Sequence, residues 1–184
     1  MRTLIADPTV LEQTLASLHP EATATSGWTR EYLDPATRTV WQLTYLLSHL
    51  HGGGYRCLIR MPAPTRADLL ALVRGSAELD EVWAAAVLLH DDPESYPELL
   101  AALEQAARAN DWARVRAAVE ASGITSGMNR RMHIGQTVAE IGRDAAHFVA
   151  LAGRSRVLAA EARAVLGPDL RSVPERASSP WAAA

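Results

Sequence analysis

Apolar residues recur three or four positions apart along most of this chain. One face of an α-helix repeats with that period, so each such stretch predicts a helix with one buried side. The stretches that show this spacing are about residues 8–18, 35–50, 65–74, 79–89, 96–110, 112–121, 126–152 and 154–166. We therefore predict an all-α fold of about seven to eight helices, either a helical bundle or a short α-solenoid.

Capping residues mark several of the expected helix ends. Asp7 precedes Pro8 and Asp34 precedes Pro35. An Asp followed by Pro is a typical helix start, because the carboxylate accepts from the first free N–H groups and Pro already has the helical φ angle. Glycines at residues 52–54 predict the end of the second helix.

The composition suits one folded domain. The chain has 184 residues, of which 48% are hydrophobic and 21% are charged. A chain of this length can bury a core of its own, and we predict a single all-α domain over residues 1–169. Residues 170–184 are rich in Pro, Ser and Ala. We predict that they form a mobile tail.

Charge is unevenly distributed along the chain. Eight carboxylates and no Lys or Arg lie between Gly75 and Ala107, in a segment that the pattern predicts to be a helical hairpin. The arginines that follow Ala107 alternate with acids, so we expect no net-positive face and no nucleic-acid partner. An acidic helical surface instead predicts a basic protein partner.

Residues 79–103 resemble a HEAT-type repeat. Acids at Leu79–Glu81 open a first helix, Asp92–Pro93 forms a turn, and Tyr96–Leu103 is a Leu-rich second helix. The resemblance implies an α-solenoid-like platform for protein binding. Bacterial domains of this size and acidity are also similar to immunity proteins of toxin systems. That similarity implies neutralisation of a basic toxin.

We expect the acidic hairpin to make the partner contacts, with an aromatic residue at the centre because Trp and Tyr are common at interface hot spots. The predicted partner-binding residues are Asp80, Glu81, Asp91, Asp92, Glu94, Tyr96, Glu98 and Trp112. One alternative to toxin neutralisation is an adaptor or a structural subunit. In that case the acidic face is merely solvated and binds no toxin. The sequence does not determine the oligomeric state.

A second alternative is a metal site on the long C-terminal helix. Two imidazoles and two carboxylates share one stripe there, namely His133, Glu140, Asp144 and His147. Asp144-x-x-His147 with Glu140 supplies half of the pattern found in carboxylate-bridged metal bundles. This reading predicts a helical-bundle enzyme or small-molecule binder with a divalent metal. The favoured reading has no cofactor and no catalytic residue.

Cys57 is the one cysteine of the chain, which excludes an internal disulfide. Its apolar neighbours Leu58 and Ile59 predict a buried thiol. No apolar run is long enough to cross a bilayer, and the acids at Asp7 and Glu12 do not suit a signal peptide. We therefore expect a cytoplasmic protein without membrane contact.

Overall fold

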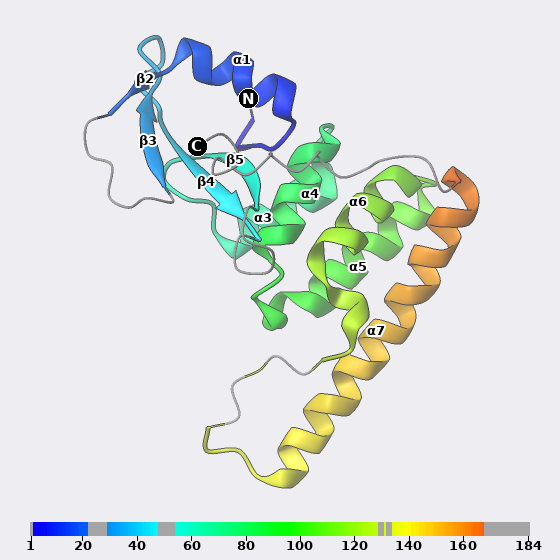
Figure 1. Cartoon of the computed structure of the whole chain (residues 1–184). Coiled ribbons are helices and arrows are strands. Elements are labelled where there is room, and N and C mark those ends of the chain that lie inside the picture. Colours follow the sequence, from blue (N-terminus) through cyan, green and yellow to red (C-terminus); the bar gives the residue numbers. More distant parts are fainter. Residues whose placement is uncertain (1, 22–28, 48–53, 129–130, 132–133, 168–184) are drawn as a thin grey trace, which may run out of the picture. The chain divides into compact units, whose positions relative to one another are not determined.

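The computed structural model divides the chain into two compact units, which are described separately below (Figure 1). The structure describes residues 2–21, 29–47, 54–128, 131 and 134–167. The first unit extends to Asp68, and the second begins at Leu69. The single domain expected over residues 1–169 stays a prediction, and the expected tail at 170–184 lies outside the described residues.

Within the described residues, the first unit is built on a five-stranded antiparallel sheet in the order β1-β5-β4-β3-β2. The strands are β1 (Leu4–Ile5), β2 (His19–Pro20), β3 (Arg30–Leu33), β4 (Val40–Leu46) and β5 (Tyr55–Arg60). The central pair is in register from Trp41 opposite Arg60 to Leu46 opposite Tyr55. The all-α prediction is therefore wrong, and the fold mixes helices with a sheet.

The sequence of β4 explains why a strand forms where a helix was predicted. Trp41 and Leu43 are buried, and they alternate with the partly exposed Val40, Gln42 and Thr44. This is the two-residue period of a half-buried strand. β-branched and aromatic residues, which are frequent here, also pack well on a pleated surface. The spacing of apolar residues over 35–50 fits a helix as well, but strand pairing determines the structure.

Asp34 begins a turn between β3 and β4 and not a helix. Its carboxylate accepts hydrogen bonds from the N–H of Ala36 at 2.9 Å and from the hydroxyl of Thr37 at 2.7 Å. Arg38 adopts a left-handed φ of 60°. An Asp that bonds to the backbone two residues further on is typical of a tight turn, so Asp-Pro is an ambiguous signal.

One face of the sheet is covered by α1 (Pro8–Ser17). As predicted, Asp7 caps this helix, and its carboxylate accepts from the N–H of Val10 at 2.9 Å. An ion pair between Glu12 and Arg56 joins α1 to β5. The core between the helix and the sheet contains Ile5, Leu11, Leu18, Trp41, Leu43 and Leu58.

The second unit is helical in all its described elements. They are α3 (Arg66–Gly75), α4 (Leu79–Leu88), the 3-10 turn η1 (Pro93–Ser95), α5 (Tyr96–Arg108), α6 (Trp112–Ser122), the 3-10 turn η2 (Ile124–Ser126) and α7 (Val138–Leu166). The helix starts predicted near residues 65, 79, 96 and 112 are thus close to those observed. α6 packs against α4, α5 and α7 and forms the centre of this unit.

The resemblance to a HEAT-type repeat is not supported. Both helices of the expected hairpin exist, as α4 and α5, but each packs extensively against α6 and not against the other. A repeat of that type needs its two helices to pair and to stack on neighbouring pairs. The acidic segment is therefore two helices whose main contacts are with α6.

The C-terminal part was predicted as two helices, over 126–152 and 154–166, but α7 is one helix of 29 residues. It starts only at Val138, where Thr137 and Glu140 form a capping box. Residues before it form η2 instead. Gly153 lies inside α7, since a single glycine weakens a helix without ending it.

Candidate binding surface

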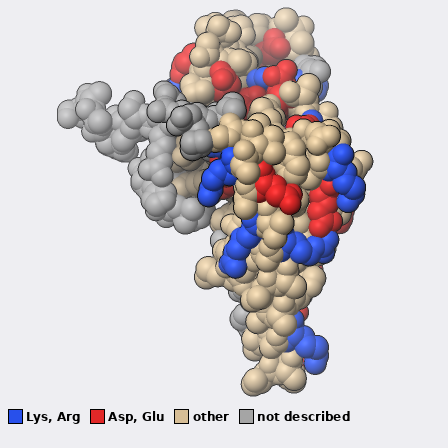
Figure 2. Space-filling view, turned by 90° about the vertical axis from the view of Figure 1, so that its right-hand side faces the viewer, with Lys and Arg blue, Asp and Glu red and all other residues tan. Residues whose placement is uncertain are grey.

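Three of the eight carboxylates between Gly75 and Ala107 pair with arginines that lie close in space. Glu94 pairs with Arg131, Glu98 with Arg74 and Glu104 with Arg154. Each arginine comes from outside the acidic segment, and the pairs form within the helical unit. Charge that is segregated along the sequence is therefore mixed on the surface, and acidic and basic side chains alternate on the face in Figure 2.

Arg131 forms the strongest of these contacts. Its Nε and Nη2 donate to the two carboxylate oxygens of Glu94 at 2.6 and 3.0 Å, and its Nη1 donates to Asp144 at 2.7 Å. The guanidinium also lies over the ring of Phe148, 5.4 Å from its centroid. The hydrogen bond with Glu94 is the main reason why the pKa of Arg131 is raised above its usual value.

Two residues predicted to contact a partner are buried. Tyr96 is 2% exposed, and its hydroxyl donates to the carbonyl oxygens of His90 and Ser122 at 2.8 and 3.2 Å. Glu81 is 5% exposed and accepts a hydrogen bond from the hydroxyl of Ser76 at 2.6 Å. These side chains stabilise the fold and are not accessible to a partner.

The remaining predicted contact residues do not converge on one patch. Asp91, Asp92 and Glu94 lie together in the turn and the 3-10 segment after α4. Asp80 lies in the first turn of α4, about 12 Å from the C-terminal end of that helix at 1.5 Å per helical residue. Trp112 begins α6 and is half-buried, whereas the end of α6, at Ser122, is the part that contacts Tyr96. Only the Asp91–Glu94 segment keeps several acids at one place.

The stripe predicted to hold a metal is occupied by structural contacts. Glu140 accepts from the backbone N–H and the hydroxyl of Thr137, both at 2.7 Å, and these bonds lower its pKa. Asp144 accepts from Arg131 and from the side-chain amide of Gln136. The ring of His147 lies edge-on to Phe148, and His133 is outside the described residues. Among the residues that are described, no three His, Cys, Asp or Glu side chains are grouped to hold a metal.

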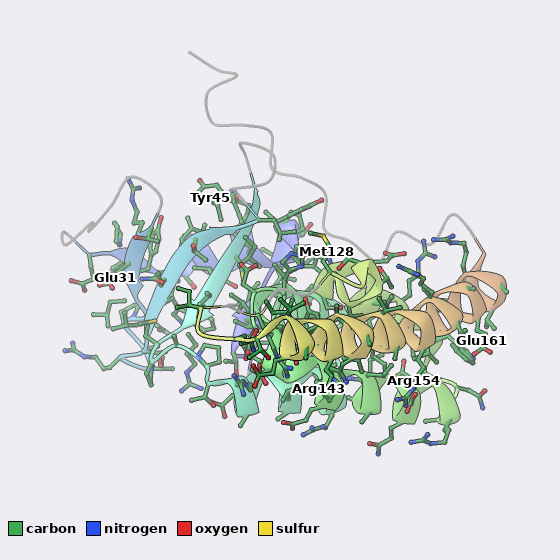
Figure 3. All side chains as sticks on the ribbon, turned by 90° about the horizontal axis from the view of Figure 1, so that it is seen from below. Glu31, Tyr45, Met128, Arg143, Arg154 and Glu161 are labelled. Atoms are coloured by element: carbon green, nitrogen blue, oxygen red, sulfur yellow. The ribbon has the colours of Figure 1, made fainter. Side chains whose placement is uncertain are left out.

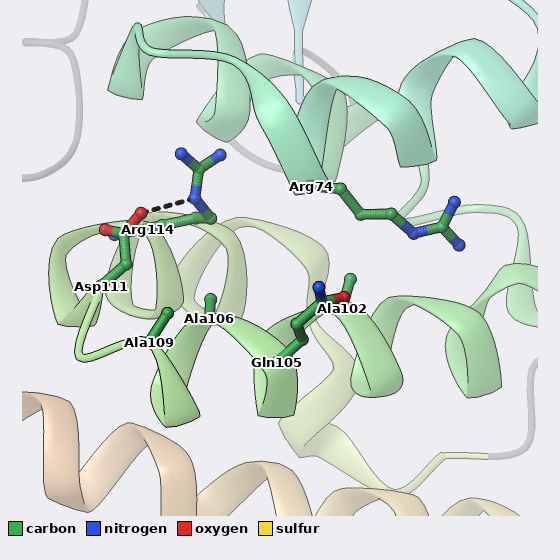
Figure 4. A pocket seen from close by; sticks show the side chains of 7 residues that line it. All are labelled: Arg74, Ala102, Gln105, Ala106, Ala109, Asp111 and Arg114. Carbon is green, nitrogen blue, oxygen red and sulfur yellow. Dashed lines mark hydrogen bonds and ion pairs between the residues drawn. The ribbon is translucent and has the colours of Figure 1, made fainter.

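A small hollow of about 140 Å³ lies between α3, α5 and α6 (Figure 4). The guanidinium of Arg114 on its rim is already bound to Asp111 at 2.7 Å and to the carbonyl of Val73 at 3.0 Å. Arg74 points away from Arg114 in Figure 4. Drug-sized ligands fill pockets of roughly 300–1,000 Å³. The hollow is therefore too small to be a binding site for such a ligand.

Cys57 is buried with no exposed surface, as its apolar neighbours predicted. Its sulfur hydrogen-bonds to the carbonyl of Leu58. In the described part of the chain, no helix combines the length and the apolar character that a membrane span requires.

The sequence analysis predicted no functional residue in the sheet unit. β3 and β4 present half-exposed polar residues on the face away from α1, including the cross-strand neighbours Glu31 and Gln42. The alternation of apolar and polar residues in β4 was the signal that could have revealed this surface. It places Gln42 and Thr44 on one face of the sheet and Trp41 and Leu43 on the other.

The fold thus presents candidate surfaces for a macromolecular partner, one on the sheet and one at the acidic turn after α4. Residues 12–62 match the family model described as Immunity protein 27. The matched segment runs from within α1 to just beyond β5, so it lies in the sheet unit and not in the acidic helices. Neither the curated proteins nor the solved structures gave a match to the chain.

Proposed function

We propose that this chain is an immunity protein, which neutralises a toxin by binding it in the cytoplasm. The match of residues 12–62 to the Immunity protein 27 family carries this proposal. It covers the C-terminal part of α1 together with strands β2 to β5. A family pattern that spans four of the five described strands and part of their covering helix is consistent with a shared recognition surface.

The sheet unit is the part that we assign to toxin recognition. The core of Trp41, Leu43 and Leu58 holds the sheet rigid under α1. Glu31 and Gln42 then occupy fixed positions on the opposite face, because side chains that face each other across an antiparallel pair stay in register. Preorganised side chains lose little entropy on binding, which favours a tight complex.

We propose further that the toxin is basic and that the acidic turn attracts it. Asp91, Asp92 and Glu94 follow one another within four residues after α4. Long-range attraction between opposite charges raises association rates by about 10 to 1,000-fold at low salt. Asp91 and Asp92 are adjacent in this turn, so their joint reversal tests this idea.

The test is rescue of growth in cells that express a candidate toxin from the same genome, followed by binding kinetics with the purified pair. The wild-type chain should restore growth, and Glu31→Arg with Gln42→Arg should abolish rescue and binding. Asp91→Arg with Asp92→Arg should slow association about tenfold at low salt and have little effect at high salt. Reversal of Glu78 and Glu120, which are exposed and lie in the helical unit outside the acidic turn, changes the net charge equally and serves as the control.

Several results would overturn the proposal. If the wild-type chain neither rescues growth nor binds the toxin candidate, the immunity function is wrong. Binding that is unaffected by the Glu31 and Gln42 substitutions would remove the sheet as the recognition surface. If the control pair slows association as much as the Asp91 and Asp92 pair, only the net charge matters and the acidic turn has no special role.

A further inference from the structure

The solvent side of α7 carries an apolar stripe. Its members recur three or four residues apart, and all are exposed: Val138, Gly142, Ala146, Val149, Gly153 and Val157. The three valines are 88%, 60% and 57% exposed. At about 100° per residue, this spacing keeps the six positions on one face of the helix. A row of exposed apolar side chains of this length marks an interaction surface.

The stripe leaves room for another helix to approach closely. A Cβ added at Gly142 or at Gly153 would meet no atom within 4 Å, so the space in front of both glycines is open. Helices pack with their axes about 8–10 Å apart, and small residues at the contact favour the shorter distance. A valine side chain of an approaching helix fits into the space above a glycine.

Two opposite charges border the stripe on one side. Arg143 and Glu161 are both exposed. They are separated by five turns of about 3.6 residues, so they project in the same direction, as Figure 3 shows. Neither of them forms an ion pair with a described residue, in contrast to Arg154 between them, which pairs with Glu104.

We propose that this stripe binds the same stripe of a second copy of the chain, with the two α7 helices antiparallel. A two-fold axis at Ala152, midway between Arg143 and Glu161, sets Arg143 of each copy opposite Glu161 of the other. The same axis places Val149 at the level of residue 155 of the other copy, between the exposed positions Gly153 and Val157 of its stripe. A parallel two-fold pair would put the charges of the two copies on opposite sides of the contact, where they form no ion pair, so the charges favour the antiparallel arrangement.

The pairing is reversible at ordinary concentrations. A single helix face buries less than the roughly 800 Å² per partner of a typical stable complex. We therefore expect a dissociation constant on the order of micromolar, which makes the dimer dissociate on dilution. Toxin binding and self-association involve different residues, so either one can be wrong without the other.

Sedimentation equilibrium of the purified full chain over a hundredfold range of concentration tests the proposal. The wild-type chain should change from monomer to dimer across this range. Val149→Asp and Val157→Asp should each weaken the dimer at least tenfold. Val165→Asp is the matched control, because Val165 is 59% exposed on the same helix but lies outside the stripe. It should leave the dissociation constant within about twofold. Circular dichroism verifies that each variant is folded.

Charge reversal tests the register. Arg143→Glu alone and Glu161→Arg alone should each be monomeric, since each places like charges opposite one another. A mixture of the two variants should form a heterodimer, because both opposed pairs are then complementary again. A wild-type chain that stays monomeric, or stripe variants that behave like Val165→Asp, would overturn the proposal. A mixture that does not dimerise would overturn the antiparallel pairing.

Discussion

Arg131 binds Glu94 through two hydrogen bonds although 37 residues separate them in the chain. The same guanidinium also holds Asp144 on α7. One basic side chain therefore joins the 3-10 segment before α5 to the first turns of α7. The guanidinium also lies over the ring of Phe148.

We expect Arg131→Ala to lower the free energy of unfolding of the helical unit by about 1–2 kcal/mol, since it removes charge-assisted bonds that are partly shielded from solvent. Arg131→Lys should lower the free energy of unfolding by a smaller amount than Arg131→Ala does. Some loss remains because an ammonium group cannot form the bidentate contact that a guanidinium makes with a carboxylate. Urea denaturation followed by circular dichroism measures both. Equal stability of the alanine variant and the wild type would show that the contacts contribute nothing.

Tyr96→Phe should destabilise the helical unit by about 1–3 kcal/mol. The substitution keeps the ring against Phe148 but leaves two buried carbonyl groups, those of His90 and Ser122, without the hydroxyl donor. Because Tyr96 is buried, the affinity of the folded variant for a toxin should stay at the wild-type value. A loss of affinity without a loss of stability would restore Tyr96 as a contact residue.

The pKa of Glu140 should lie below the ordinary value of 4.5, because the backbone N–H and the hydroxyl of Thr137 bind the ionised form. A depressed pKa in the folded state means that the cap contributes stability above about pH 4.5 and loses it as the pH falls through the lower value. Carboxyl-carbon NMR titration measures this pKa. Thr137→Ala should raise it towards 4.5, and a wild-type pKa at or above 4.5 would contradict the assignment of the cap.

Trp41→Ala should cost the sheet unit about 3–5 kcal/mol, as expected when a large side chain is removed from a packed core. Gln42→Ala, at the next position and on the other face, should cost less than about 1 kcal/mol. Hydrogen exchange resolved by residue measures the effect on each strand. Similar losses for the two variants would mean that α1 and the sheet do not enclose a core around Trp41.

Most of the helices could be predicted from the sequence because their signals are local. Pro and Asp at the start of α1, and Thr65 with Asp68 before α3, act through hydrogen bonds to residues two to four positions away. Such contacts exist whatever the rest of the chain does. The observed starts of α3 to α6 accordingly lie close to the predicted ones.

The sheet could not be found in the same way, because its hydrogen bonds are not local. Val40 to Leu46 contains enough apolar residues to satisfy a helical pattern, and what makes it a strand is pairing with Tyr55–Arg60 and Arg30–Leu33. Tertiary context of this kind overrides local preference. The alternation of buried and half-exposed residues in β4 was present but was outweighed by the Asp34-Pro35 signal.

The acidic surface was overestimated for a related reason. Counting charges along the chain treats Glu94, Glu98 and Glu104 as exposed and alone, whereas Arg131, Arg74 and Arg154 approach them from elsewhere in the fold. Ion pairs between distant residues leave no local sequence signal. The immunity function was suggested by overall size and acidity, yet the family match lies on the sheet, outside the segment on which that suggestion rested.

The seven residues from Glu81 to Val87 in α4 are buried on every side of the helix. No side of this stretch faces solvent, so a small local opening does not expose its amide protons to water. We expect the amides of this stretch to exchange with deuterium only when the whole helical unit opens, and to be the slowest in it. The exchange rate of these amides would then measure the lifetime of the native helical unit.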